Sequence, residues 1–243
     1  MRAKGRRYPS AVPAARSLKR RGSWAFAVAG NLAHVASQRL AADNGRPSLA
    51  GDRWVEWSFC VARLADGHGR TLDFGADIGF LSLAAAQRGH DVIALDRVEI
   101  TPDYHHERVE FRQGDILDRP LEGESFDQIL NCSSVEHAGL SGRYESSDIP
   151  DGDLEAMGIM RETLAPGGRM VMTIPVGCDL VCPPLHRIYG DERLPRLLDG
   201  YAVQEEQYWR KDRAWEPTDR ETALATQGSE SFYSLGLFVL GRS

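Results

Sequence analysis

Short apolar segments and helical segments alternate through the middle of this chain, and this alternation restricts the fold more than any other feature. Helical patterns cover residues 80–88 and 153–165, and Pro166-Gly167-Gly168 stops the second. Strands that alternate with helices form a mostly parallel sheet with helices on both faces. A ligand is then expected beyond the carboxyl ends of the strands. Five segments have the length and apolar character of buried strands: residues 70–74, 91–95, 109–112, 126–131 and 169–174.

The segments on either side of this region have other patterns. Residues 176–200 are rich in Pro, Leu and Arg and are expected to form a lid inserted after the fifth strand. Residues 201–209 are compatible with a sixth strand. Residues 232–240 alternate aromatic and apolar side chains and predict a final strand. Near the start, residues 54–65 predict a helix that leads into the first strand.

Charge is distributed unevenly along the sequence. Residues 1–50 contain ten Lys or Arg and one acid, whereas the remainder contains 19 basic and 34 acidic residues, a net charge of −15. A run of like charge is most often a solvated arm, although a basic arm could also contact an anionic substrate, a lipid surface or a partner subunit. The acidic remainder disfavours a nucleic-acid substrate, because nucleic acids are polyanions and bind to basic surfaces.

A stretch near the N-terminus carries apolar side chains at nearly helical spacing. It is too short to span a bilayer, which needs about 20 apolar residues. We expect an amphipathic helix that covers the active site or joins two copies as a homodimer. The chain would then divide into a basic arm with a helical cap at 1–66 and a main domain at 67–243. The apolar positions are Trp24, Val28, Leu32, Val35 and Leu40.

The four cysteines form no CxxC pair, a usage typical of reduced thiols in the cytoplasm. We therefore expect a cytoplasmic protein.

The first strand ends in a turn that carries two glycines, Gly75 and Gly79, in the sequence LDFGADIG. A nucleotide that lies across a strand end requires close approach of the backbone, which glycine permits. The pattern D-x-G-x-D-x-G lacks the third glycine of the dinucleotide motif, which disfavours NAD. Asp73 precedes the turn, and its carboxylate suits a positively charged group, such as an amino group, better than a diphosphate.

Polar residues also follow the next three strands. Asp96, followed by Arg97, ends the second strand and can accept hydrogen bonds from two ribose hydroxyls. Asp115 can reach an adenine amino group while Ile116 packs on the ring. At the end of the fourth strand, Asn131, Cys132 and Ser133 would lie beside the part of the ligand beyond its ribose. The segments concerned are Gly114-Asp115-Ile116 and Asn131-Cys132-Ser133.

The chain resembles the class I S-adenosylmethionine (SAM)-dependent methyltransferases, in the style of the ubiquinone and menaquinone biosynthesis enzymes. The resemblance covers about residues 70–176. It implies a Rossmann-like, seven-stranded sheet with an antiparallel last strand in a SAM-binding domain at 67–243. S-adenosylhomocysteine (SAH) would be the product. The matching segments are LDFGADIGFLSLAAAQRGHDVIALD, QGDIL, FDQILNCSSVEH and LAPGGRMVMTIP.

The resemblance implies cofactor contacts from several of the residues named above, and it contains one departure. Asp77 stands where the family usually has a third glycine, which raises the question whether SAM binding is weakened. A residue other than glycine at positive φ is uncommon, although aspartate is tolerated better than most. The implied contacts come from Asp73, Gly75, Gly79, Asp96, Asp115 and Ile116.

Two histidines are candidates for the chemistry. His137, with Glu136 beside it, follows the fourth strand by a few residues and could act as a general base or simply order the loop. His186, in the expected lid, is the second candidate. Glu136, His137 and His186 could together bind a divalent metal, but such a sparse set is more often structural and no metal is favoured. Pro183 and Pro184 argue against a helical zinc site formed with Cys178 and Cys182.

Other residues could shape the acceptor pocket. Arg143 and Arg187 could bind an anionic acceptor or could pair with acids of this acidic domain. The aromatic residues of the last hundred positions could line the pocket or belong to the core. They are Tyr144, Tyr189, Tyr208, Trp209 and Trp215.

The resulting prediction is a SAM-dependent methyltransferase that acts on a small molecule, with a hydroxyl of a secondary metabolite or sugar as the favoured acceptor. Two alternatives stay open. One is a SAM-binding enzyme of the same fold that catalyses another reaction, such as a cyclisation. The other is a non-catalytic module that binds a partner.

Overall fold

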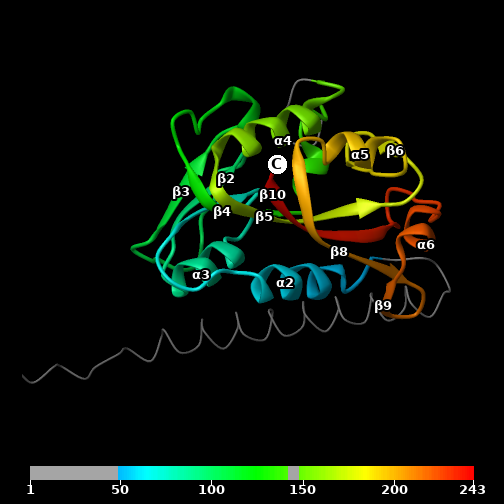
Figure 1. The fold of residues 1–243 in the computed structure, drawn as a ribbon, viewed down its shortest axis with the longest axis horizontal. Coiled ribbons are helices and arrows are strands. Elements are labelled where there is room, and N and C mark those ends of the chain that lie inside the picture. The colour runs from blue at the N-terminus through cyan, green and yellow to red at the C-terminus, as the bar shows by residue number, and fades with distance from the viewer. Residues whose placement is uncertain (1–48, 142–147) are drawn as a thin grey trace, which may run out of the picture. The chain divides into compact units, whose positions relative to one another are not determined.

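The computed structural model describes residues 49–141 and 148–243, and Pro47–Ser243 forms one compact unit. A central sheet lies between two helical layers (Figure 1). Helices α2 (Asp52–Ala62) and α3 (Phe80–Gln87) cover one face. Helices α4 (Gly152–Thr163) and α5 (Arg193–Leu197) cover the other. The expected α/β architecture with a largely parallel sheet is therefore confirmed.

The sheet contains eight strands in the order β3-β2-β1-β4-β5-β10-β8-β9. The first five of these pair in parallel, and β10 runs antiparallel to both β5 and β8. The antiparallel last strand is thus confirmed. The strands are β1 (Arg70–Phe74), β2 (Asp91–Asp96), β3 (Val109–Gln113), β4 (Phe126–Cys132), β5 (Leu164–Val176), β8 (Tyr201–Lys211), β9 (Trp215–Thr218) and β10 (Ser234–Arg242).

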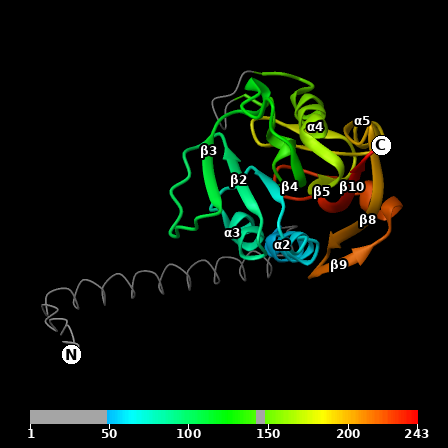
Figure 2. The same cartoon turned by 60° about the vertical axis from the view of Figure 1, so that its left-hand side comes forward.

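The expected number of seven strands was wrong, because β9 adds an antiparallel edge strand beyond β8. Its four residues, Trp-Glu-Pro-Thr, are too few for a recognisable alternation, and Pro217 is tolerated because an edge strand need not donate to a further neighbour. The strand lies beside the start of α2, as Figure 2 also shows. There the Lys211 ammonium donates to the carbonyl oxygen of Ala50, and Trp215 packs against the core cluster that contains α2.

Alternating side chains of the central strands separate the two layers of the core. On β5, Met170 and Met172 point into the layer that includes α4, whereas Val171 points to the layer that includes α2 and α3. On β10, Phe238 points into the layer that includes α4, and Leu237 points into the layer that includes α2 and α3. The central strands are therefore buried on both faces, which is why they contain near-continuous apolar runs.

The segment expected to be a lid forms a short hairpin and a helix. Strands β6 (Leu180–Cys182) and β7 (His186–Ile188) pair antiparallel, and α5 follows them. The outer strand β6 is partly exposed, but every residue of β7 is buried, as is Tyr189. Strand β7 and Tyr189 therefore pack as part of the domain core.

Short helices complete the fold. The 3-10 turns η1 (Ile116–Asp118) and η2 (Val135–His137) follow β3 and β4, and helix α6 (Arg220–Leu224) precedes β10. The expected helical cap at 24–40, like Arg143 and Tyr144, lies outside the described residues, so the proposed division at residue 66 stays a prediction. In residues 49–141 and 148–243, no helix is long and apolar enough to cross a membrane.

Candidate functional site

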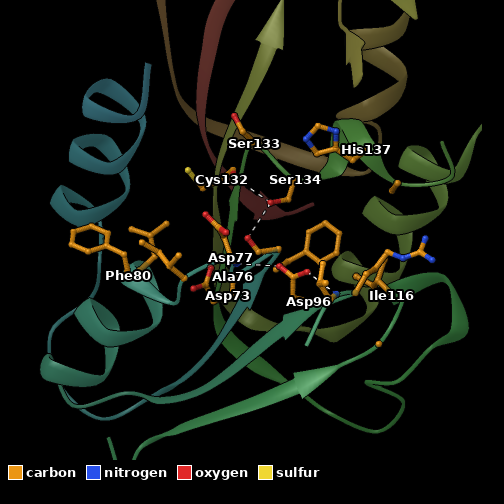
Figure 3. Close-up of a pocket in the computed structure, with 18 of the residues that line it drawn as sticks. Asp73, Ala76, Asp77, Phe80, Asp96, Ile116, Cys132, Ser133, Ser134 and His137 are labelled. Carbon is orange, nitrogen blue, oxygen red and sulfur yellow. Dashed lines mark hydrogen bonds between the residues drawn. The ribbon is translucent and has the colours of Figure 1, made fainter. Parts of the chain in front are cut away.

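A pocket opens at the carboxyl ends of β1, β2 and β4, next to the point where the strand order reverses between β1 and β4 (Figure 3). Open α/β sheets bind their ligands at this position. Ten of the twelve residues that the sequence predicted to contact a cofactor line this pocket: Asp73, Gly75, Asp77, Asp96, Arg97, Gly114, Asp115, Ile116, Cys132 and Ser133.

The turn after β1 depends on backbone angles that glycine adopts readily. Gly75 has φ +72°, and a Cβ atom built there would lie 2.1 Å from Ser134 Oγ. Gly79 has φ +74°, and its carbonyl accepts a hydrogen bond from the Tyr104 hydroxyl at 2.6 Å. Asp77 also adopts positive φ, at 50°. At Gly75 the backbone therefore lies against the pocket without an intervening side chain.

Asp73 presents a buried carboxylate to the pocket. Only 2% of the residue is exposed, and Ser82 Oγ donates to its Oδ2 at 2.5 Å. Burial raises the pKa of Asp73 from 3.8 to about 6, and the nearby negative charge of Asp96 adds to the effect. Burial disfavours the ionised form of this carboxyl, and a ligand with a positive charge beside it would stabilise that form.

The end of β2 brings a second carboxylate close to the turn. Asp96 Oδ2 accepts a hydrogen bond from the Asp77 backbone N–H at 3.0 Å, and Oδ1 accepts one from the Val98 N–H at 3.0 Å. Each carboxylate oxygen has two lone pairs. Asp96 therefore has acceptor capacity left for ligand hydroxyls while its orientation is fixed by the backbone.

Beyond β3, Asp115 and Ile116 form the far side of the pocket. Asp115 Oδ1 caps η1 by accepting from the Leu117 N–H at 3.0 Å, and Oδ2 pairs with Arg97 Nη1 at 3.0 Å. Ile116 is buried and supplies an apolar surface. The guanidinium of Arg97 is engaged by a carboxylate, so it does not make this half of the pocket basic.

The two remaining residues that were predicted to contact the cofactor, Gly79 and Asn131, support the fold instead. Gly79 is the residue before α3, where its positive φ turns the chain into the helix. Asn131 is fully buried, and its Oδ1 accepts from the Val135 N–H at 3.2 Å, which stabilises the loop after β4. Neither residue lines the pocket.

Helix α2 and the start of α3 contribute pocket residues that the sequence reasoning did not assign to the site. Arg53 and Trp57 come from α2, and Trp57 packs on Phe80 with ring centroids 4.8 Å apart. The spacing of Arg53 and Trp57, one helical turn apart, was the only signal that they share a face. Together these residues form an aromatic wall with one cation at its edge.

A buried carboxylate attaches α2 to the sheet. Glu56 Oε1 accepts from the Thr173 hydroxyl at 2.9 Å and from the Ser133 hydroxyl, and Oε2 pairs with Arg53 Nη1 at 2.9 Å. Burial raises the pKa of Glu56, and the Arg53 charge opposes this. Glu56 therefore holds two pocket residues, Arg53 and Ser133, in fixed positions.

The two candidate histidines occupy different positions. His137 lines the pocket, and in Figure 3 it lies across the cavity from Phe80. Its Nδ1 lies 2.5 Å from the carbonyl oxygen of Leu185, and its Nε2 lies 3.8 Å from Glu136 Oε1. Glu136 and His186 are buried and do not line the pocket. The His186 ring lies between His137 and Tyr233, with centroid distances of 6.5 and 5.3 Å.

Three other sequence candidates belong to the protein interior and not to the pocket. Tyr189 and Tyr208 are buried and do not line the pocket, and Arg187 is buried, pairs with Asp153 and does not line the pocket either. Among the described residues, no group of three or more His, Cys, Asp or Glu side chains is arranged to hold a metal ion. Cys60, Cys132, Cys178 and Cys182 are all free thiols.

The pocket residues fit the cofactor that the sequence resemblance implies. Four carboxylates line it, on Asp73, Asp77, Asp96 and Asp115, and the cation nearest to them is paired. Such a lining suits amino and hydroxyl groups and disfavours a diphosphate, because like charges in a partly buried site repel. The glycine turn leaves space for a ligand to approach the backbone.

The sheet order, the antiparallel β10 and the pocket at the strand ends define the class I SAM-dependent methyltransferase fold. More narrowly, the chain belongs to the family described as Caenorhabditis protein of unknown function, DUF268, whose profile matches residues 75–227. No curated protein matches the sequence.

Several solved structures share this fold at low sequence identity. The Burkholderia thailandensis 1,6-didemethyltoxoflavin-N1-methyltransferase, with bound 1,6-didemethyltoxoflavin and SAH, is 18% identical with a TM-score of 0.56, covering 98% of this chain and 93% of its own. The N-methyltransferase NodS from Bradyrhizobium japonicum WM9 is 17% identical with a TM-score of 0.52, covering 79% and 96%. The [4+2]-cyclase SpnF is 16% identical with a TM-score of 0.54, covering 82% and 84%.

Proposed function

We propose that this protein binds SAM in the pocket at the strand ends and methylates a small molecule. The observation that carries the proposal is the buried carboxylate of Asp73, which lies beside the glycine turn and has a raised pKa of about 6. A buried carboxylate of this kind favours a ligand with a positive charge, and the amino group of SAM is one.

Each part of the cofactor has a partner of matching chemistry. Asp73 would accept from the amino group, and Asp96 would accept from the ribose hydroxyls with its remaining lone pairs. Ile116 would pack on the adenine ring, and Asp115 would accept from the adenine amino group. Gly75 would allow the backbone to lie against the ligand.

The acceptor would lie between α2 and the loop after β4. When bound, SAM supplies an electrophilic methyl group. Trp57 and Phe80 would hold a flat or apolar part of the acceptor, and Arg53 would bind a polar substituent. His137 would remove the proton from the acceptor hydroxyl as methylation proceeds. The protein's contribution would be mainly alignment of the two substrates and this proton transfer.

The substrate class is proposed as a secondary metabolite or a sugar, with oxygen as the acceptor atom. For a small molecule, support comes from the Trp57–Phe80 ring pair in the pocket lining and from the B. thailandensis N1-methyltransferase of the same fold, which holds 1,6-didemethyltoxoflavin. A histidine base suits a hydroxyl, because its ordinary pKa of about 6.5 allows proton uptake near neutral pH.

A second candidate is a cyclisation or another non-methylating reaction on the same fold. The observation in its favour is the fold similarity to the [4+2]-cyclase SpnF. In that reaction the pocket around Trp57 and His137 would fold a substrate into a reactive shape, and SAM would be left intact.

Two measurements test the proposal. Titration calorimetry of the full chain with SAM and with SAH should give binding by both, and binding of neither would exclude the proposed cofactor. Mass spectrometry after incubation with SAM and a panel of hydroxylated aromatics and sugars should then find SAH and a product heavier by one methylene unit. A converted acceptor of unchanged mass beside intact SAM would favour the second candidate.

A further inference from the structure

The hairpin formed by β6 and β7 reaches the candidate base. His137 Nδ1 lies 2.5 Å from the carbonyl oxygen of Leu185, which stands directly before β7. A carbonyl oxygen can only accept a hydrogen bond, so Nδ1 carries the proton of this contact. In a neutral imidazole the other nitrogen then has the lone pair. The Leu185 contact therefore selects the tautomer in which Nε2 is the basic nitrogen.

Arg187, two residues further along, holds the backbone on both sides of His137. Its Nη1 donates to the carbonyl oxygen of Ala138 at 2.7 Å and to that of Glu136 at 3.3 Å. Its Nη2 donates to the carbonyl oxygens of Pro150 at 3.1 Å and Ile149 at 3.3 Å. One guanidinium thus connects the histidine loop to the segment that leads into α4.

This arrangement requires arginine in particular. The guanidinium has five donors in a fixed plane, so its two terminal nitrogens can serve two separate segments at once. Lysine would carry the same charge, but its ammonium is a single point that cannot bridge both pairs of carbonyls. Arg187 is 1% exposed, which leaves no surface for a substrate anion.

A buried charge of this kind needs compensation, and Asp153 supplies it. Asp153 is fully buried, and its Oδ1 lies 3.6 Å from Arg187 Nε. The same carboxylate accepts from Arg193 Nε at 2.8 Å and from the Tyr189 hydroxyl at 3.1 Å. The network is therefore continuous from α5 through Asp153 to the loop that carries His137.

We propose that Arg187 is a positioning residue for His137, and that the segment from Leu185 to Arg187 sets the Nδ1–H tautomer of that histidine. The tautomer itself does not depend on the proposed function, and only the role of His137 as a base rests on it. Nε2 lies 3.8 Å from the buried carboxylate of Glu136, so an imidazolium formed by proton uptake at Nε2 is stabilised by an adjacent negative charge.

The tautomer can be measured without a substrate. Full-length protein labelled with 15N-histidine is studied by long-range 1H–15N correlation NMR over a series of rising pH values, and the tautomer is assigned where the His137 signals no longer change with pH and the ring is neutral. The signals of His137 are identified by their loss in His137→Gln. We expect an N–H type nitrogen at Nδ1 and a lone-pair type nitrogen at Nε2. The opposite pattern, or an even mixture of the two, would overturn the proposal.

Two charge-conserving variants separate positioning from a general contribution to stability. Arg187→Lys removes the bridge to the carbonyls beside His137, and Arg193→Lys disturbs the same Asp153 without touching that loop. We expect a mixed tautomer in Arg187→Lys and the wild-type pattern in Arg193→Lys. A wild-type pattern in a folded Arg187→Lys protein would refute the positioning role. If that variant does not fold, the wild-type spectrum still decides the tautomer.

Cofactor binding and turnover complete the test. SAH affinity, measured by calorimetry, should stay within about threefold of wild type in Arg187→Lys, because Arg187 does not line the pocket. Turnover should fall about tenfold or more, a part of the 10²–10⁴-fold contribution of a general base, and Arg193→Lys should retain it. Absence of SAH binding by the wild-type protein would refute the proposed function, while the NMR result would still decide the tautomer.

Discussion

Replacement of Asp73 by asparagine should make the protein more stable and less able to bind its cofactor. The carboxyl is 2% exposed, and burial raises its pKa from 3.8 to about 6. Each pKa unit corresponds to about 1.4 kcal/mol, so the ionised carboxylate costs the folded state about 3 kcal/mol at neutral pH. Asparagine has nearly the same shape, can still accept from Ser82, and carries no charge.

The pH dependence of this cost has a definite sign. Because the folded-state pKa of Asp73 lies above the unfolded value, the folded protein binds more protons between pH 3.8 and about 6. The free energy of unfolding therefore falls as the pH rises through that window. Asp73→Asn should lack this loss. The free energy of unfolding of the variant should exceed that of wild type by close to zero near pH 3.8 and by up to about 3 kcal/mol at neutral pH.

Urea denaturation near pH 4 and at neutral pH measures the stability difference, and calorimetry with SAH measures binding. At about 2–4 °C per kcal/mol, the variant's Tm at neutral pH should rise by about 6–12 °C. SAH should bind about 10- to 150-fold more weakly, since a charge-assisted hydrogen bond contributes about 1.5–3 kcal/mol. Asp118→Asn removes an exposed carboxylate outside the pocket lining and should change neither quantity.

A stability difference that does not grow between the two pH values would refute the assignment of a buried, charged Asp73. Unchanged SAH affinity would refute its role toward the amino group.

Three further variants test the turn and the base. Gly75→Ala should lose at least tenfold in SAH affinity and about 1–3 kcal/mol of stability, because the φ of Gly75 is +72° and the new Cβ would overlap Ser134. Calorimetry measures the affinity and urea unfolding measures the stability. Wild-type values of both would refute this prediction. Asp77→Gly should relieve a φ of 50° and keep SAH affinity at or above wild type, so tenfold weaker calorimetric binding would instead assign the Asp77 carboxylate to the ligand. His137→Gln should lower turnover about 10²–10⁴-fold with SAH affinity kept, and an equal loss of both would remove it from the role of base.

The succession of strands and helices and many residues of the candidate pocket were predictable because they depend on local patterns. The ends of parallel strands meet at one edge of the sheet, so residues at or just after those ends, such as Asp73, Asp96 and Asp115, come together in any fold of this kind. Asn131 shows the limit of this rule. Successive side chains of a strand point to opposite faces, and its side chain is directed into the protein.

The part of the pocket that is proposed to bind the acceptor could not be located in the same way. Arg53 and Trp57 belong to α2, which precedes the first strand and is not one of the strand ends, and nothing in their spacing says where the helix docks. The buried Glu56, which contacts the ends of β4 and β5, attaches the helix there. The edge strand β9 escaped prediction for a related reason, since four residues that include Pro217 form a strand only because β8 is already present.

The amino-acid pattern alone was sufficient for the α/β class, the glycine turn around Gly75 and the carboxylates at the strand ends, because these depend on backbone freedom and on neighbours close in sequence. It also pointed to His137, but not to the atom of the ring that would act. That choice depends on the Leu185 carbonyl, 48 residues away, and on the buried Arg187 guanidinium. Hydrogen bonds between distant segments exist only once the chain has packed, so the basic nitrogen of His137 is a property of the folded molecule.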